Sequence, residues 1–386
     1  MFPYGRQDIN NNDIDSVIDV LKSDFLTQGT QVPLFEKKVS EYCGAKFAIA
    51  VNSATSALHI ACLSLGLKKG DRLWTSPNSF AASANCGLYC EAIIDFVDID
   101  KQTYNLCPDE LEKKLILAKR DDKLPTIVIP VHFAGQSCDM KKIYSLSKEY
   151  GFKIIEDASH AIGGRYLNDP IGNCRYSDIT VFSFHPVKII TTGEGGMALT
   201  NNEELFKKMN RLRTHGITND KEIMEPRSED EIWNYQQIEL GFNYRMTDIH
   251  AALGISQLKR LDNFVSHRHA LKDRYDKMLA ELPLILPYQN KDTYSSFHLY
   301  PIQVDLKKIN RSHSSIFRSL REKGLGVNLH YIPIHRHPFY QKIGFKSGDF
   351  PIAENYFKQA ISIPIFYSLS FEEQDEVIST IKEVLV

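Results

Sequence analysis

The sequence reads Phe182-Ser183-Phe184-His185-Pro186-Val187-Lys188 near the middle of the chain, and the glycine-rich turn Thr191-Thr192-Gly193-Glu194-Gly195-Gly196 follows. The apolar run at 179–184 predicts a buried strand that ends shortly before the lysine. A lysine kept away from water or near other cations is partly neutral and can form a Schiff base. Single loop lysines are usually solvated, so the meaning of Lys188 depends on what the chain brings beside it.

Strands and helices alternate along the chain on the N-terminal side of this lysine. Short apolar runs predict further strands at 47–51, 93–97, 126–131 and 152–155. The segments at 54–65 and 139–150 have the apolar content and spacing of helices. This alternation is typical of an α/β fold with a mostly parallel central sheet covered on both faces. Ligands bind such sheets at the carboxyl ends of the strands, so we expect the functional residues directly after them.

The two ends of the chain follow other patterns. Apolar residues at helical spacing after Asn12, a plausible cap, predict a helix that ends near Leu21. Residues 216–238 are polar and predict a long loop. The remaining expected elements are a long helix at 247–278, strands at 299–304, 326–329 and 361–365, and helices at 312–323 and 371–384. We therefore expect a large domain at 1–250, and a linking helix with a smaller α+β domain at 251–386.

The composition argues against several classes of protein. The 386 residues carry a formal net charge of −2 and no Lys/Arg run, which disfavours nucleic-acid binding. The N-terminus lacks a signal-peptide pattern, and no apolar run approaches the roughly 20 residues of a membrane span. Seven scattered cysteines favour the reducing cytoplasm. Cys86 and Cys90 lie four apart in an apolar stretch and indicate core packing, so we expect no metal site.

Two further segments follow predicted strands. Asn52-Ser53-Ala54-Thr55-Ser56 precedes a helix, whose N-terminal N–H groups suit a phosphate, although Ser and Thr are also ordinary caps. Glu156-Asp157-Ala158-Ser159-His160 places two acids after a buried strand, where a carboxylate must be solvated, paired or functional. A helix cap and a core imidazole are the simpler interpretations of Asp157 and His160.

Together these segments supply what an enzyme dependent on pyridoxal 5′-phosphate (PLP) requires. Such an enzyme needs a Schiff-base lysine, a carboxylate for the pyridine nitrogen, a phosphate cradle and a group that stacks on the ring. The candidates are Lys188, Asp157, the turn at 53–56 with Ser183, and Phe80 in Pro77-Asn78-Ser79-Phe80-Ala81. Their joint occurrence after strands of one sheet is far more specific than any single member.

With these residues in place, the sequence resembles the DegT–StrS family of sugar-nucleotide aminotransferases, which have the PLP-dependent transferase (aspartate aminotransferase) fold. The resemblance covers essentially the whole chain. It is carried by Phe25-Leu26-Thr27-Gln28-Gly29, Asn52 to Leu58, Glu156-Asp157-Ala158, Ser183 to Lys188 with Glu194-Gly195-Gly196, Gly241-Phe242-Asn243-Tyr244-Arg245-Met246 and His330-Tyr331-Ile332-Pro333. Some members carry histidine in place of the lysine and dehydrate sugars, and Lys188 argues against that branch.

The resemblance implies a role for each candidate. Lys188 would form the Schiff base and move the proton between the two carbons, and Asp157 would pair with the pyridinium. His160 would lie near the 3-hydroxyl of the cofactor, and Phe80 would stack on its ring. The phosphate would be held by Ser53, Ala54, Thr55 and Ser183. Asn243 would reach the phosphate of the neighbouring subunit, which implies a homodimer with shared active sites.

Within the family, the similarity is strongest to the C4 aminotransferases of pseudaminic acid biosynthesis, whose substrate is a UDP-linked 4-keto-6-deoxy-N-acetylhexosamine. This similarity is carried by Tyr4, Asp24-Phe25-Leu26-Thr27, His132-Phe133-Ala134-Gly135-Gln136 and 330–333. The implied substrate-binding residues are Tyr4, Asp24, Phe25, Leu26, Thr27, Ala54, Ser183, Asn243, His330, Tyr331, Ile332 and Pro333.

The implied reaction is a ping-pong transfer in which L-glutamate gives its amino group to the cofactor, which then passes it to C4 of the sugar. One alternative is the same chemistry on a GDP- or dTDP-linked 4-keto sugar or on a 3-keto sugar. Another is a PLP-binding regulator without turnover, which would need an added DNA-binding or membrane segment. A purely structural protein of this fold would not need Lys188 and Asp157 together.

Overall fold

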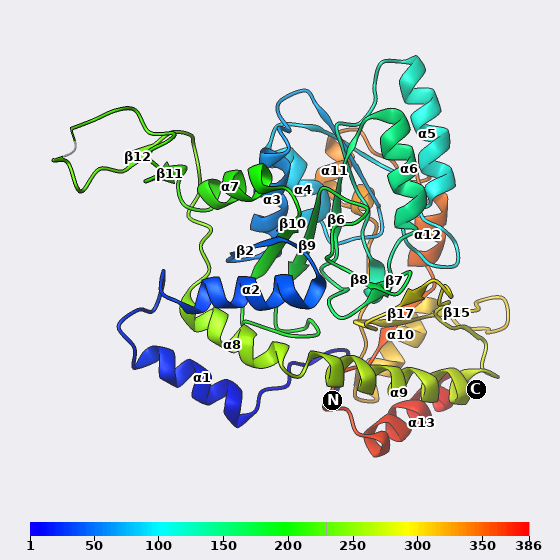
Figure 1. Cartoon of the computed structure of the whole chain (residues 1–386). Coiled ribbons are helices and arrows are strands. Elements are labelled where there is room, and N and C mark those ends of the chain that lie inside the picture. Colours follow the sequence, from blue (N-terminus) through cyan, green and yellow to red (C-terminus); the bar gives the residue numbers. More distant parts are fainter. Residues whose placement is uncertain (229, 386) are drawn as a thin grey trace.

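A seven-stranded sheet forms the centre of the molecule (Figure 1). This is a computed structural model, and it describes residues 1–228 and 230–385. The strand order is β2-β10-β9-β6-β5-β3-β4. The strands are β2 Phe47–Val51, β3 Arg72–Thr75, β4 Ile93–Phe96, β5 Ile127–Ile129, β6 Lys153–Asp157, β9 Ile179–Ser183 and β10 Gly196–Thr200. β10 pairs antiparallel with β2 and β9, and the other strand pairs of this sheet are parallel, which confirms the mostly parallel α/β fold.

Alternate side chains of each strand enter hydrophobic clusters on opposite faces of the sheet. In β6, Ile155 joins the cluster that contains residues of α3 and α4, whereas Ile154 joins the cluster of α5 and α6. The covering helices are α2 Gln31–Cys43, α3 Ala54–Ser64, α4 Ala82–Tyr89, α5 Pro108–Arg120, α6 Met140–Tyr150 and α7 Glu203–Leu212. Cys86 and Cys90 are buried in the α3–α4 cluster, as the apolar stretch predicts.

The sequence did not predict two strands of the sheet, β3 and β10. The first begins with a charged residue and the second with Gly196, so neither reads as a clear apolar run. Gly196 has a steric reason, because a Cβ there would lie 2.4 Å from the backbone nitrogen of Ala54. The glycine therefore lets β10 approach the start of α3 closely.

The prediction of one helix at 247–278 is wrong. The segment forms α8 Asp248–Leu258 and α9 Leu261–Leu279, with Arg260 between them. The guanidinium of Arg260 donates to the carboxylates of Asp8 and Asp13 near the N-terminus, at 2.5 Å each. This contact depends on tertiary structure, which helical periodicity does not reveal. The cap of α1 Asn11–Leu21 is likewise Asn10 in place of Asn12, because Asn10 and Asp13 form a reciprocal capping box.

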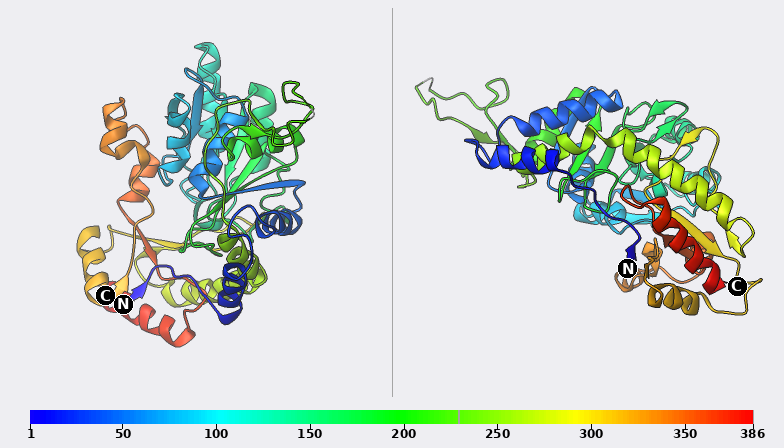
Figure 2. Two further views of the ribbon diagram at one scale, coloured as in Figure 1. Left: turned by 90° about the vertical axis from the view of Figure 1, so that its left-hand side faces the viewer. Right: turned by 90° about the horizontal axis from the view of Figure 1, so that it is seen from below.

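The polar segment expected as a loop forms an arm that stands away from the rest of the chain (Figures 1 and 2). Its base is a short antiparallel pair, β11 Ile217–Thr218 with β12 Gln236–Gln237. The helix at 248–258 begins shortly after the arm.

The C-terminal part has its own sheet and hydrophobic cluster. The sheet contains β13 Leu284–Ile285, β15 Tyr300–Val304 and β17 Ala360–Ile363, and the cluster adds side chains of α9, α10 His313–Glu322 and α13 Phe371–Leu385. The strand expected at 326–329 is only β16 Leu325–Gly326, which pairs with β1 Phe2–Pro3. The division at residue 250 stays a prediction. Within the described ranges, no helix is both long and apolar enough to cross a membrane.

The remaining elements are short. They are β7 Arg165–Tyr166, β8 Asp169–Pro170 and β14 Thr293–Tyr294, which form one small sheet, the helices α11 Pro338–Lys342 and α12 Pro351–Phe357, and two 3-10 turns at Phe133–Gly135 and Ile334–Arg336.

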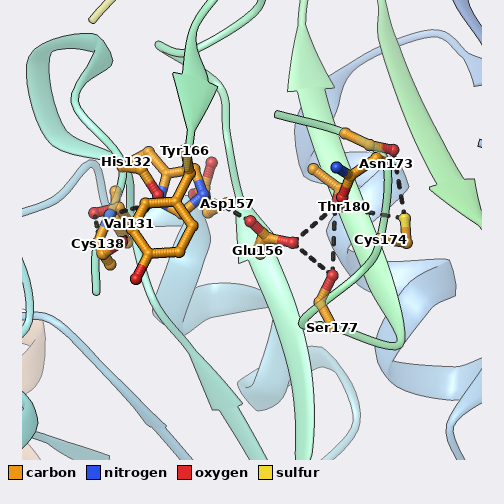
Figure 3. Close-up of polar contacts among 12 residues, drawn as sticks. Val131, His132, Cys138, Glu156, Asp157, Tyr166, Asn173, Cys174, Ser177 and Thr180 are labelled. Atoms are coloured by element: carbon orange, nitrogen blue, oxygen red, sulfur yellow. Dashed lines mark hydrogen bonds and ion pairs between the residues drawn. The ribbon is translucent and has the colours of Figure 1, made fainter. Parts of the chain in front are cut away.

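A buried polar network joins β6 to β9 and to the segment that follows β5 (Figure 3). The carboxylate of Glu156 accepts hydrogen bonds from His132 Nε2 at 2.7 Å, Ser177 Oγ at 2.5 Å and Thr180 Oγ1 at 3.0 Å. Burial by itself raises the pKa of Glu156, but these donors outweigh it and hold the pKa below its ordinary value. Glu156 is therefore a paired structural carboxylate, on the face of β6 opposite to Asp157.

We predict that Glu156→Gln lowers the free energy of unfolding by about 1–3 kcal/mol at neutral pH, because a buried charge-assisted network is lost. The native pKa is lowered, so this contribution is complete above the unfolded-state pKa of about 4.3 and disappears as the pH falls through the native value. Urea denaturation from neutral to acid pH tests this. The difference from wild type should shrink at acid pH, and the exposed control Glu322→Gln should stay within about 0.5 kcal/mol. A difference that stays constant with pH would contradict the assignment.

Candidate active site

A cavity of about 920 Å³ lies at the carboxyl ends of β6 and β9 and beside the start of α3. It brings together most residues that the sequence singled out. Those that line it are Tyr4, Ser53, Ala54, Thr55, Phe80, Asp157, His160, Ser183, Lys188, His330, Tyr331 and Ile332. Residues separated by more than 300 positions in the chain therefore share one cavity.

Lys188 and Asp157 both line this cavity. Lys188 is half-buried, and desolvation by the surrounding protein lowers the pKa of its ammonium to about 8, against the opposing effect of Asp157. An amine with this pKa is partly neutral near pH 7 and can act as a nucleophile and as a proton carrier. The Asp157 carboxylate accepts from Ser159 N at 3.1 Å and from Ser83 Oγ at 2.6 Å.

His160 is a neutral imidazole with a defined orientation. Its Nδ1 accepts a hydrogen bond from Ala134 N at 3.3 Å, so its Nε2 carries the proton and donates to the hydroxyl of Tyr331 at 3.0 Å. Burial, and then the charges of Lys188 and His330, lower the pKa of His160 well below its usual value. His160 can therefore form hydrogen bonds in the cavity without adding a second cation.

The start of α3 has the donors that a phosphate requires. Ser53 caps the helix by accepting from Ser56 N at 3.1 Å. The backbone N–H groups of Ala54 and Thr55 form no hydrogen bond among the described residues, and both residues line the cavity. Free N–H groups at a helix N-terminus bind anions. The side chain of Phe80 is 65% exposed although it lies at the cavity wall, which leaves an aromatic face open to a planar ligand.

Another part of the wall comes from the N-terminus and the segment at 328–332. The rings of Tyr4 and His330 lie 5.0 Å apart. Burial, followed by the charge of Lys188, lowers the pKa of His330 to about 3, and burial raises the pKa of Tyr4. This part of the wall is therefore uncharged, and it suits a ligand with hydroxyl and carbonyl groups. Pro333 is buried behind it and does not line the cavity.

Two sets of predicted residues lie outside the cavity. The segment at 24–27 is exposed, and Asp24 and Phe25 line a separate hollow of about 430 Å³ next to α1, α2 and α8. The end of this segment is fixed by Asp248, whose carboxylate accepts from the backbone nitrogens of Gly29, Gln31 and Val32. Asn243 is also exposed, and its carbonyl oxygen accepts from Asn52 Nδ2 at 3.4 Å.

Sequence reasoning assigned no role to several residues in or beside the cavity, among them Ser79, Ser83 and His298. Ser79 and Ser83 follow β3 at a four-residue spacing, which was a usable signal once β3 was recognised as a strand. No local signal identifies His298, which lies 110 positions after Lys188 and whose ring is 4.4 Å from that of His160.

The chain matches a known family of enzymes. Residues 7–382 match the DegT/DnrJ/EryC1/StrS aminotransferase family. The sequence is 38% identical over 388 residues to UDP-4-amino-4,6-dideoxy-N-acetyl-beta-L-altrosamine transaminase of Campylobacter jejuni, covering 100% of this chain and 98% of that protein.

Solved structures agree with this match. PseC of Helicobacter pylori, an aminotransferase involved in the biosynthesis of pseudoaminic acid, is similar with a TM-score of 0.90 and 30% identity, covering 100% of this chain and 99% of that chain. The PLP form of Spr1654 from Streptococcus pneumoniae gives a TM-score of 0.88 at 29% identity, with 99% and 98% covered. The predicted fold and cofactor are thereby confirmed. The chain belongs to the DegT/DnrJ/EryC1/StrS aminotransferase family, and its cofactor is pyridoxal 5′-phosphate.

Proposed function

We propose that the protein transfers an amino group from L-glutamate to C4 of a UDP-linked 4-keto-6-deoxy-N-acetylhexosamine, the step that pseudaminic acid biosynthesis requires. The carrying observation is the pairing, in one cavity, of Asp157 with a lysine whose pKa is lowered to about 8. The similarity to the Campylobacter jejuni transaminase supports the choice of substrate.

PLP, when bound, supplies an electron sink that lowers the barrier for moving a proton at the adjacent carbon. In the proposed arrangement, Lys188 Nζ would hold the cofactor covalently at rest. Once the amine of the donor had displaced it, the freed amine of Lys188 would take up and return that proton. Asp157 holds the ring nitrogen protonated, and His160 hydrogen-bonds the 3-hydroxyl. Ser53, Ala54, Thr55 and Ser183 bind the phosphate, and Phe80 covers one face of the ring.

The uncharged wall is the proposed site of the sugar. The wall offers uncharged hydrogen-bonding groups, namely the hydroxyls of Tyr4 and Tyr331 and the imidazole of His330. These groups can bind a keto sugar without placing a charge next to its carbonyl. Ile332 contributes apolar contact, and Pro333 supports its backbone from behind. A GDP- or dTDP-linked 4-keto sugar and a 3-keto sugar remain the alternative substrates. We place the reaction in the cytoplasm.

The active unit that we propose is a homodimer. The arm exposes Ile232 and Trp233, and Leu240 follows the arm; the three residues are 91%, 72% and 79% exposed. Such apolar surface favours a protein contact. Asn243 follows the arm and would reach the phosphate site of the other subunit, and residues 24–27 would complete that subunit's sugar cleft.

Lys188→Ala tests the chemical step. Loss of the nucleophile and proton carrier should reduce turnover by at least about a thousand-fold, while the variant folds and binds PLP reversibly. Borohydride reduction followed by peptide mass spectrometry should place PLP on Lys188 in the wild type and leave the variant unlabelled. The exposed Lys101→Ala should behave as the wild type. Retained turnover in Lys188→Ala would refute the proposal.

A substrate panel tests the sugar. The UDP-linked 4-keto-6-deoxy-N-acetylhexosamine should give a kcat/KM at least about 100-fold above that of its dTDP- and GDP-linked counterparts, since a site built for particular polar groups leaves buried groups unpaired with the wrong ligand. Equal or higher values for another nucleotide would move the assignment to that substrate.

Mixed dimers test the shared site. Lys188→Ala and Asn243→Ala should each be impaired alone. In an equal mixture, random pairing makes about half of the dimers mixed, and each mixed dimer has one intact site. The mixture should therefore recover about a quarter of the wild-type activity. If Asn243 serves its own subunit, the mixture recovers nothing beyond the average of the two variants.

A further inference from the structure

Asp157 lies at the end of a chain of buried hydroxyl groups. Ser83 Oγ, on α4, donates to Asp157 Oδ2 at 2.6 Å, and Ser79 Oγ lies 2.7 Å from Ser83 Oγ. All three residues are buried, with side chains no more than 5% exposed. An ionised carboxylate only accepts hydrogen bonds, so Ser83 must donate to it and must accept from Ser79. The chain therefore has one direction, from Ser79 through Ser83 to Asp157.

The backbone of Asp157 does not depend on this contact. Asp157 N donates to Pro130 O at 2.9 Å, and Asp157 O accepts from His132 N at 3.0 Å. On the opposite face of β6, the Glu156 network adds a further anchor (Figure 3). The hydroxyl of Ser83 therefore acts on the carboxylate and its rotamer, since the strand is already fixed by other bonds.

The chain of hydroxyl groups also begins next to Phe80, the residue proposed to stack on the cofactor. Ser79 directly precedes Phe80, whose exposed ring lines the cavity. The hydroxyl pair thus links the segment that carries Phe80 to the carboxylate of Asp157.

We propose that Ser83, supported by Ser79, is a positioning residue that keeps the carboxylate of Asp157 aimed at the ring nitrogen of the cofactor. This inference rests on the proposed role of Asp157. A hydrogen bond to the ionised form of a carboxylate favours that form, and in a buried site it offsets the cost of removing the charge from water. An aligned Asp157 would keep the ring nitrogen protonated, and the positive ring would then lower the pKa of the nitrogen that joins Lys188 to the cofactor.

The test is a pH titration of the visible absorption band of the PLP-loaded enzyme, together with the dissociation constant of PLP. Ser83→Ala should move the titration midpoint upward by about half a pH unit or more and weaken PLP binding by about ten-fold. Ser83→Thr, which keeps the hydroxyl, should restore wild-type values. Ser79→Ala should shift both quantities in the same direction by less, and it tests the chain independently if Ser83→Ala does not fold.

The matched control is Ser76→Ala. Ser76 is 1% exposed on the same connection between β3 and α4, and its hydroxyl accepts from Asn78 N at 3.2 Å without reaching Asp157. Its titration midpoint should equal that of the wild type. An equal shift in Ser76→Ala, or a folded Ser83→Ala with a wild-type midpoint and PLP affinity, overturns the inference.

Asp157→Asn separates this inference from the proposed function. If Asp157→Asn shifts the midpoint and Ser83→Ala does not, only the role of the hydroxyl chain fails. If Asp157→Asn leaves the band unchanged, the proposed role of Asp157 fails as well.

Discussion

The parallel pairing of β6 with β9 is the constraint on which the site depends. Asp157 lies opposite Val181 in this pairing, so the ends of the two strands meet at one edge of the sheet. Ser183 ends β9, and the chain after it carries Lys188 into the cavity that Asp157 also lines. The Glu156 network crosses the same strands from the other face, and it keeps this edge in register (Figure 3).

Burial shifts the pKa values of several titratable side chains that line the cavity. The cavity holds Lys188, His160 and His330, and desolvation moves each of these three toward its neutral form. It lowers the pKa of Lys188 to about 8 and that of His330 to about 3, and it lowers the pKa of His160 far enough to keep that ring uncharged. A site in which the imidazoles are neutral and Asp157 has two hydrogen-bond donors suits a cofactor that itself carries charge at its phosphate and its ring nitrogen.

The sequence predicted the parts of this arrangement that depend on local pattern. The apolar run at 47–51 predicted a strand correctly. Asp157, at the end of β6, and Lys188, a few residues after β9, could be predicted as cavity residues because strand ends in an α/β sheet are known ligand sites. Contacts made across the fold were not. Arg260 lies where the helix expected at 247–278 is interrupted and contacts Asp8 and Asp13, and Ser83 reaches Asp157 across 74 positions of sequence. Asn243 and residues 24–27 are exposed in the single chain, and the proposed homodimer would give them a role in the site of the other subunit.

The most direct test of the central claim follows the visible absorption of the PLP-loaded enzyme through a full cycle. The account predicts that L-glutamate bleaches the band of the bound cofactor, and that the UDP-linked 4-keto-6-deoxy-N-acetylhexosamine then restores it with formation of the aminated sugar. Failure of glutamate to change the band, or a bleached enzyme that no keto sugar restores, would contradict an aminotransferase built on Lys188 and Asp157.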